Sequence, residues 1–148
     1  MKSRLNITLL LFAVIVLFAC TGKKPGEKSN LKQNVKFEQY MVEGQLLYQQ
    51  HCINCHQATG QGLGKLYPPL ANSDFMLDNM EAVICLIKNG ISGKIIVNGV
   101  EYNQAMPGIP RITNLEIAEI ATYIYNSWGN SAGQITTEKV EAVLKTCE

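Results

Sequence analysis

The sequence lacks an excess of charge of either sign. Its 148 residues include 13 Lys+Arg and 12 Asp+Glu, for a formal net charge of +1 at pH 7. Because no basic surplus is present to displace counterions from phosphates, the composition gives no support for nucleic-acid binding. Five cysteines are too few for a scaffold of this length that is held by disulfides alone. At 47% hydrophobic residues, the chain is nevertheless not globally disordered.

The N-terminal hydrophobic run is too short to cross a bilayer. Leu9–Ala19 contains eleven apolar residues, whereas a spanning helix needs about 20. A short apolar run behind two basic residues and before a small residue is typical of a signal peptide, here residues 1–19. Ala19 followed by Cys20 resembles the bacterial lipobox, in which the Cys becomes the lipidated mature N-terminus. We therefore expect an exported lipoprotein, anchored to a bacterial membrane on the periplasmic or extracytoplasmic face; the alternative is an uncleaved anchor.

Charge divides the rest of the chain into two parts. Residues 20–36 are rich in lysine, without apolar periodicity, and predict a flexible basic tether. Residues 37–148 contain 6 Lys+Arg and 11 Asp+Glu, so this domain carries a net charge of −5. That charge predicts docking that is partly electrostatic, against a basic patch on a partner.

The folded part predicts an all-α domain with a small hairpin and long loops. Apolar periodicity and capping patterns predict helices over 38–51, 79–89, 113–127 and 138–146. On the first helix Val42, Leu46, Leu47 and His51 recur at helical spacing, and Gly44 suits close packing against another helix. Asp78 to Glu81 and Thr113 to Glu116 resemble capping boxes, Gly90 is a typical helix stop, and Thr137 could cap the last helix.

Asn98-Gly99 predicts a tight hairpin turn. The loops 57–73 and 101–112 need something to order them, which favours a cofactor or another function. Beyond about residue 130 we expect a C-terminal extension.

The strongest chemical signal is Cys52-Ile53-Asn54-Cys55-His56. Cys-x-x-Cys-His is the attachment motif of c-type haem, in which two thiols bind the vinyl groups and the His approaches the iron. A zinc site would need a second Cys/His pair, and the sequence has no suitable one elsewhere. A thioredoxin-like site would need a βαβ context, which is also absent. The motif therefore predicts one covalent haem c, with Cys52 and Cys55 as attachment points and His56 as an iron ligand.

The second axial ligand of the iron must come from elsewhere in the chain. His51 is too close to the motif to reach the opposite haem face. Met76 and Met80 lie in or beside a predicted helix, where methionine usually fills a core. Met106 precedes Pro107-Gly108 in a loop, and a thioether on a rigid turn suits an axial ligand. The sequence therefore favours Met106.

The ordered set of motifs resembles the class I, monohaem cytochrome c family over nearly all of residues 40–130. The residues that carry the resemblance are Gly44, Tyr48, Cys52–His56, Tyr67–Leu70, Ile95–Gly99, Tyr102-Asn103, Met106-Pro107, Tyr123 and Trp128–Asn130. The resemblance implies that the Pro69 carbonyl holds the second ring nitrogen of His56 and that Leu70 touches the haem. It also implies that Gly44 and Tyr48 pack against the helix that bears Tyr123.

A His/Met iron has no free position for substrate, so the sequence favours an electron-transfer protein over an enzyme. We expect a monomeric, membrane-tethered one-electron carrier that shuttles electrons between respiratory or periplasmic redox proteins. The alternative is the electron-entry subunit of a fixed dehydrogenase or reductase complex, for example one like nitrite reductase. A third hypothesis is an enzyme or gas sensor in which Met106 is labile.

Two cysteines remain once haem and lipid are assigned. Cys85 lies in a predicted helix and Cys147 near the C-terminus. Because thiols are usually paired in an oxidising compartment, we expect a disulfide between them. The alternative is a buried Cys85 and a free Cys147.

Overall fold

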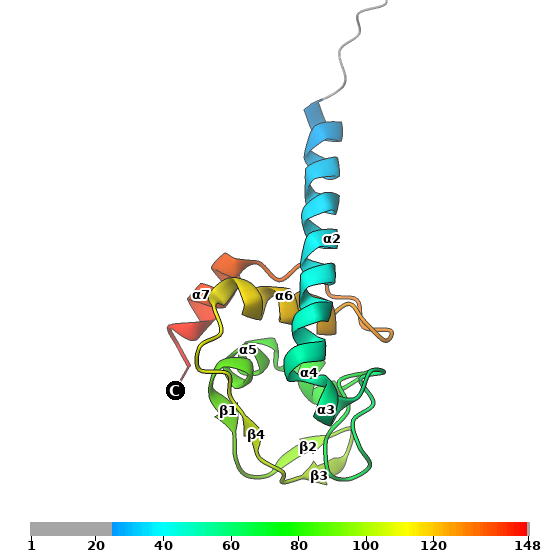
Figure 1. The fold of residues 1–148 in the computed structure, drawn as a ribbon, viewed down its shortest axis with the longest axis vertical. Helices are drawn as coiled ribbons and strands as arrows, with labels where there is room; N and C mark the ends of the chain where they lie inside the picture. Colours follow the sequence, from blue (N-terminus) through cyan, green and yellow to red (C-terminus); the bar gives the residue numbers. More distant parts are fainter. Residues whose placement is uncertain (1–24, 148) are drawn as a thin grey trace, which may run out of the picture. The chain divides into compact units, whose positions relative to one another are not determined.

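The computed structural model describes residues 25–147, with side chains from residue 32 onward. The predicted signal peptide and Cys20 lie outside these residues. The chain divides into two compact units, Met1–Gln33 and Asn34–Glu148, and the predicted helical fold with small strands is confirmed for the second (Figure 1). The elements are α2 (Pro25–His51), α3 (Ile53–His56), α4 (Asp74–Asp78), α5 (Met80–Asn89), β1 (Gly90–Ile91), β2 (Ile95–Val97), β3 (Val100–Tyr102), β4 (Met106–Pro107), α6 (Asn114–Ile124) and α7 (Thr137–Leu144). Within the described part, no helix combines the length and the apolar character needed to cross a membrane.

Helix α2 begins earlier than expected. It starts at Pro25, so residues 25–36 of the predicted flexible tether are helical, and that part of the prediction is wrong. Proline is well tolerated as the first residue of a helix. The segment also contains three Lys and one each of Glu, Gln and Leu, which together make up half of it and have high helix propensity even without an apolar face. Absence of apolar periodicity was therefore a poor guide to helix formation here.

The buried face of α2 differs from the predicted one. Tyr40, Gly44 and Tyr48, spaced four residues apart, face the core, whereas Val42 and Leu46 are 56% and 55% exposed. The apolar periodicity pointed to the wrong side of the helix because the contact surface is built from tyrosines and a glycine. Aromatic rings bury a large area while their hydroxyls keep a polar partner.

Gly44 allows α2 and α6 to cross closely, as expected. A Cβ atom at Gly44 would lie 2.1 Å from the carbonyl oxygen of Glu119 and 2.7 Å from the Cβ of Tyr123. Beside this crossing, Tyr48, Tyr123 and Trp128 form a cluster with ring centroids 5.1–5.5 Å apart. Tyr48 therefore packs against the helix that bears Tyr123, as the resemblance implied.

Helix α5 matches its prediction at the C-terminal end but not in its cap. Gly90 follows the last helical residue and its N–H donates to the carbonyl of Leu86. The expected capping box at Asp78 is wrong, because Asp78 ends the separate short helix α4. The residue before α5 is Asn79, whose side chain donates to a carbonyl of α4 instead of capping α5.

The two C-terminal helices begin at threonine caps. The capping box of Thr113 and Glu116 is confirmed at the start of α6, which ends at Ile124, three residues before the predicted end. Helix α7 is capped by Thr136 rather than Thr137, since the Thr136 side chain accepts from the N–H of Lys139.

Two small antiparallel pairs order the segments between the helices. Strands β2 and β3 form the predicted hairpin, with Asn98-Gly99 as its turn. The sequence did not predict the second pair, in which β1 binds β4 with Ile91 opposite Met106. This pair fixes part of the long loop before α6 against the end of α5.

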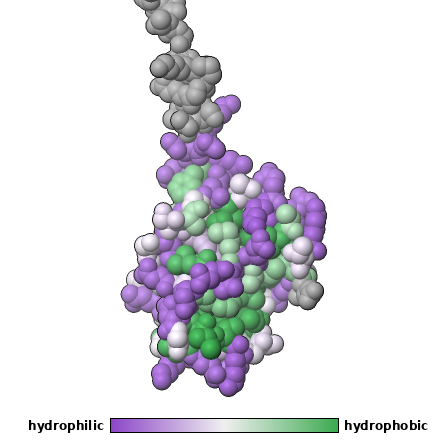
Figure 2. Space-filling view, turned by 180° about the vertical axis from the view of Figure 1, so that it is seen from behind, coloured by the Kyte–Doolittle hydropathy of each residue, from purple (hydrophilic) through white to green (hydrophobic). Residues whose placement is uncertain are grey.

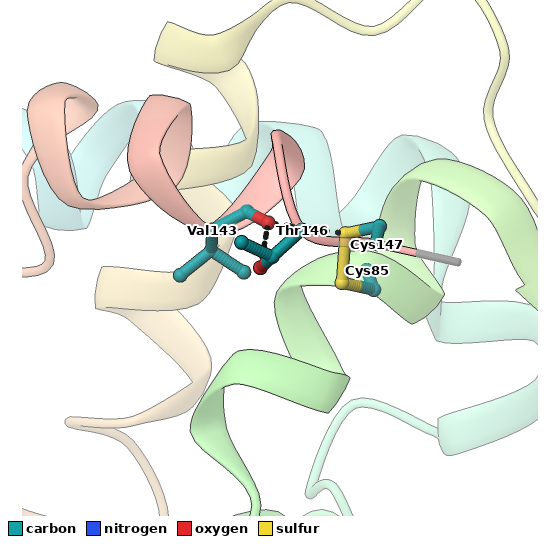
Figure 3. The surroundings of a disulfide bond; sticks show 4 residues. All are labelled: Cys85, Val143, Thr146 and Cys147. Atoms are coloured by element: carbon teal, nitrogen blue, oxygen red, sulfur yellow. Dashed lines mark hydrogen bonds between the residues drawn. A yellow bond between two sulfur atoms is a disulfide. The ribbon is translucent and has the colours of Figure 1, made fainter.

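A disulfide joins the C-terminal segment to the domain. Cys85 of α5 and Cys147, just after α7, are bonded with their Cα atoms 5.7 Å apart (Figure 3). Helix α7 also buries Val140 and Val143 against the core. The predicted C-terminal extension is thus packed onto α5 and α6.

Candidate functional site

The Cys-x-x-Cys-His segment forms a single helical turn at the end of α2. The N–H of Cys52 continues α2 by donating to Tyr48, and the N–H of His56 donates to the carbonyl of Cys52 at 2.9 Å. Both thiols of the motif are free and both residues line one pocket. Burial, with a smaller effect of Cys55, raises the pKa of Cys52 to about 12, so that it is a neutral thiol. The turn brings two thiols and an imidazole to the same pocket wall.

His56 is held in one tautomer and orientation. Its side chain is buried, and Nδ1 lies 3.0 Å from the carbonyl oxygen of Pro68. Because a carbonyl can only accept, Nδ1 carries the hydrogen and Nε2 keeps its lone pair. Burial lowers the pKa of His56, and the bond to Pro68 opposes that shift in part. Neutral imidazole with one free nitrogen is the form that binds a metal.

The carbonyl that holds His56 belongs to Pro68, so the assignment of this role to Pro69 is wrong. The chain after the two prolines is fixed by the Gly60 carbonyl, which accepts from the N–H groups of Leu70 and Ala71. With the residues after Pro69 held in this way, the carbonyl of Pro68 faces the imidazole of His56. Gly62, at φ +68°, lets the loop pass close by, since a Cβ there would lie 2.6 Å from the Pro68 oxygen. Both prolines line the pocket.

The loop 57–73 is held by side chains from distant elements. The Tyr48 hydroxyl donates to the carbonyl of Gln57 at 2.6 Å, and Trp128 Nε1 donates to that of Ala58 at 3.1 Å. Farther along, Asn130 Nδ2 donates to the carbonyl of Leu70 at 3.1 Å. The aromatic cluster therefore does more than pack: it fixes the backbone that follows the motif.

The pocket is deep and mainly apolar. Its walls come from helices α2 to α6, strands β1 to β3 and the loops around residues 67–73 and 104–109. The space between them, partly open to solvent, is about 1150 Å³. The mainly apolar lining suits a large, flat cofactor. All six predicted haem contacts line it: Cys52, Cys55, His56, Pro69, Leu70 and Met106. The two free thiols, the oriented imidazole and the apolar walls are the donor set and surroundings that a covalent haem requires.

Met106 lies on an anchored loop. Its backbone pairs with Ile91, and Lys88 Nζ donates to the carbonyls of Pro110 and Ile112, both at 2.9 Å, beyond it. Gly108 permits the close approach to α5, because a Cβ there would lie 2.4 Å from the backbone of Asn89. The loop is therefore fixed on both sides of the thioether.

The other candidate side chains are placed differently. Met76 also lines the pocket, but its side chain is 1% exposed within the core and its carbonyl accepts from the Tyr125 hydroxyl. Met80 packs against the core and does not line the pocket, whereas His51 lies at the exposed side of it.

The sequence did not reveal several residues that build the site. The role of Pro68 was assigned to its neighbour, and the contacts of Gly62 and of the Asn130 side chain were not foreseen. Gly62 alone had a usable signal, since glycine in a turn-rich loop often marks a close backbone approach.

Comparisons with known proteins agree with this arrangement. The family model described as cytochrome c matches residues 41–128. Cytochrome c-552 of Thermus thermophilus is 32% identical over 94 residues, which cover 61% of this chain and 71% of that protein. Cytochrome c-551 of Bacillus subtilis is 36% identical over 63 residues, covering 43% and 56%. The cytochrome c subunit of a quinone alcohol dehydrogenase from Gluconacetobacter polyoxogenes is 30% identical over 109 residues, which cover 71% of this chain but only 23% of that subunit.

Proposed function

Because the chain belongs to the cytochrome c family and carries covalent haem c, we propose that it is a membrane-tethered one-electron carrier. Cys52 and Cys55 hold the haem, and His56 and Met106 bind its iron. The observation that carries the proposal is the position of His56, buried with Nδ1 on the Pro68 carbonyl and Nε2 free. The haem supplies an iron that alternates between the ferric and ferrous states.

The protein's contribution is to close and orient the site. Pro68 fixes the plane of the His56 ring, and such second contacts raise the basicity of a ligand. The anchored loop keeps the Met106 thioether beside the pocket, and methionine ligation raises the reduction potential. If His56 and Met106 both bound the iron, no coordination position would be left for a substrate. The apolar walls exclude water, which limits rearrangement when the charge of the iron changes.

The central test is spectroscopic and uses the whole protein. We expect the haem to remain on the chain after acid-acetone extraction and denaturing electrophoresis. Cys52→Ser and Cys55→Ser should each leave only one covalent link. The reduced protein should bind carbon monoxide slowly or not at all. Rapid carbon monoxide binding by the wild type would favour the third hypothesis, an enzyme or gas sensor.

A second function is the electron-entry subunit of a fixed oxidoreductase complex. The similarity to a subunit of quinone alcohol dehydrogenase favours it. Purification of the tagged protein from its own membranes separates the two functions. A carrier should elute alone and monomeric, whereas a subunit should elute with a catalytic chain in fixed proportion.

Membrane tethering rests on the sequence around Cys20. We expect the mature protein to begin at Cys20 with lipid attached. Cys20→Ser should accumulate as an unprocessed precursor, and mass spectrometry of the wild type should show the lipid. An unmodified Met1, or a free N-terminus beyond Cys20, would contradict the tether.

A further inference from the structure

The two compact units of the chain carry charges of opposite sign. After the predicted signal peptide, residues 20–33 contain four lysines and one acidic residue, Glu27, for a net charge of +3. Residues 34–148 contain 7 Lys+Arg and 11 Asp+Glu, for a net charge of −4. We call residues 20–33 the basic segment; its lysines are Lys23, Lys24, Lys28 and Lys32.

The basic segment is partly built into helix α2. Lys28, Leu31 and Lys32 are spaced three and four residues apart in this helix, so their positions are neighbours on one side of it. The side chain of Lys32 is exposed and forms no ion pair with the residues that the structure describes. The next lysine, Lys36, differs, because its ammonium lies 5.5 Å from the centroid of the Tyr40 ring and is held by the domain.

The charge on the exposed side of α2 changes sign farther along the helix. Glu38 and Glu43 line a shallow groove there, together with Val35 and Val42. Figure 2 shows mostly hydrophilic side chains where α2 enters the domain, whereas apolar ones gather at the other end, at the height of the hairpin in Figure 1. Because carboxylates repel anions, attraction to an anionic surface is confined to the part of α2 before Glu38.

We propose that the basic segment binds the anionic headgroups of the phospholipid bilayer that carries the lipid anchor. The proposal rests on the membrane tether at Cys20. Only four residues separate Cys20 from Pro25, and this stretch spans at most about 17 Å when extended. The anchor therefore keeps the start of α2 near the headgroups, whereas an acidic partner protein would have to find it by diffusion.

The strength of this binding depends on the number of lysines. Each lysine close to an anionic bilayer strengthens binding by about fivefold, since it contributes about 1.4 kcal/mol or slightly less to a tenfold scale. The attraction falls off within a Debye length, which is about 8 Å at physiological salt. Leu31 lies between two lysines in the helix and adds an apolar contact with the interface.

Vesicle flotation measures this binding without the contribution of the anchor. The mature holoprotein is exported with an ordinary signal peptide and the change Cys20→Ser, so that it keeps residues 20–148 but carries no lipid. At low salt it should float with vesicles of phosphatidylcholine that contain one third phosphatidylglycerol, and not with phosphatidylcholine alone. Salt at 1 M, where the Debye length is about 3 Å, should abolish the binding.

Two double variants of equal net charge separate the basic segment from the rest of the chain. Lys28→Gln combined with Lys32→Gln should weaken binding to the anionic vesicles by more than about tenfold. Glutamine and lysine have similar helix propensity, so α2 should persist. The matched control combines Lys65→Gln with Lys145→Gln, two exposed lysines of the domain, and should weaken binding less than about twofold.

The outcomes separate this proposal from the tether itself. Equal losses in the two double variants, or flotation that does not depend on phosphatidylglycerol, would overturn binding by the basic segment. Absence of flotation with the anionic vesicles would overturn it as well and would favour an acidic partner protein. In either case the tether stands if the lipidated wild type floats with phosphatidylcholine alone, and it fails if that protein does not float.

Discussion

His56 donates from Nδ1 to the carbonyl oxygen of Pro68, 3.0 Å away and twelve residues later in the chain. Proline fixes its own φ angle and has no N–H, so two consecutive prolines hold this carbonyl on a stiff segment. The Gly60 carbonyl then secures the residues that follow. The imidazole is thus oriented by backbone alone, and its second nitrogen stays available at the pocket.

Replacing Met106 should open the iron while leaving the fold intact. In Met106→Leu the volume of the side chain is nearly conserved but the sulfur is lost, and such exchanges usually destabilise by less than about 1.5 kcal/mol. We expect the haem to stay attached, the absorbance band of the methionine–iron(III) bond to disappear, and carbon monoxide and cyanide to bind rapidly. The reduction potential should fall, because thioether ligation raises it.

Met76 and Met80 provide matched controls for this exchange. Met76→Leu changes a pocket-lining methionine of the core, and Met80→Leu one that does not line the pocket. Both variants should keep the methionine–iron band. If the band is lost in Met76→Leu and kept in Met106→Leu, the ligand assignment is wrong.

Gly44→Ala should destabilise the domain although alanine is the better helix former. The added Cβ would lie 2.1 Å from the Glu119 carbonyl oxygen, so the two helices must separate. Overpacking of this kind destabilises by about 1–3 kcal/mol. The better helix propensity of alanine offsets about 1 kcal/mol of that, so we expect a net loss of up to about 2 kcal/mol. Denaturant unfolding measures the change, and Gln45→Ala on the exposed side of the same helix is the control. Equal stability of the two variants would contradict the close crossing.

The sequence predicted helices best where caps and turns are local. Thr113 with Glu116, Gly90 and Asn98-Gly99 behave as expected, since each acts within four residues. The caps expected at Asp78 and Thr137 were wrong, because Asn79 and Thr136 precede those helices instead. The apolar face of α2 failed because its true contact surface consists of tyrosines and Gly44, whose role depends on what α6 brings near. The start of α2 failed because helix propensity extended the helix through a segment without apolar periodicity.

The site was predictable in its chemistry but less so in its backbone contacts. The spacing from Cys52 to His56 is the one that haem attachment requires, so these residues alone predict the chemistry of the site. Which proline carbonyl faces His56 depends on distant hydrogen bonds to the Gly60 carbonyl. Likewise, strands β1 and β4, which pair Ile91 with Met106, have two residues each and lie far apart in the sequence. Strands this short show no alternation of apolar and polar residues that would predict them.

Two carboxylates on α6 should have opposite effects on stability as pH changes. Burial, together with nearby Glu43 and Glu116, raises the pKa of Glu119. The ionised form is thus disfavoured in the folded state, and stability is lost as pH rises through the normal glutamate range toward the raised pKa. Glu119→Gln should therefore increase Tm at pH 7, and the difference should shrink as pH falls below about 4.

Glu116 is the matched control for this prediction. Hydrogen bonds from the backbone and side chain of Thr113 lower its pKa. Its contribution to stability is therefore present above the normal glutamate range and is lost as pH falls toward the lowered pKa. Glu116→Gln should decrease Tm at pH 7, with the difference fading in acid. Thermal unfolding of both variants from pH 3 to 8 measures the two trends, and slopes of the same sign would contradict them.

The last prediction concerns the bond between Cys85 and Cys147. The bond closes a sequence separation of 62 residues, for which chain entropy allows up to about 4 kcal/mol of stabilisation, with measured values extending down to zero. Cys85→Ser, Cys147→Ser and the double variant should all lower stability to a similar degree, because each removes the same link. Neither cysteine lines the pocket, so the haem spectrum should not change. Thiol counting on the unfolded, unreduced wild type should find neither Cys85 nor Cys147 reactive. Two reactive thiols would contradict the disulfide. A spectral change in the serine variants would contradict a bond whose only effect is to hold α7 against α5.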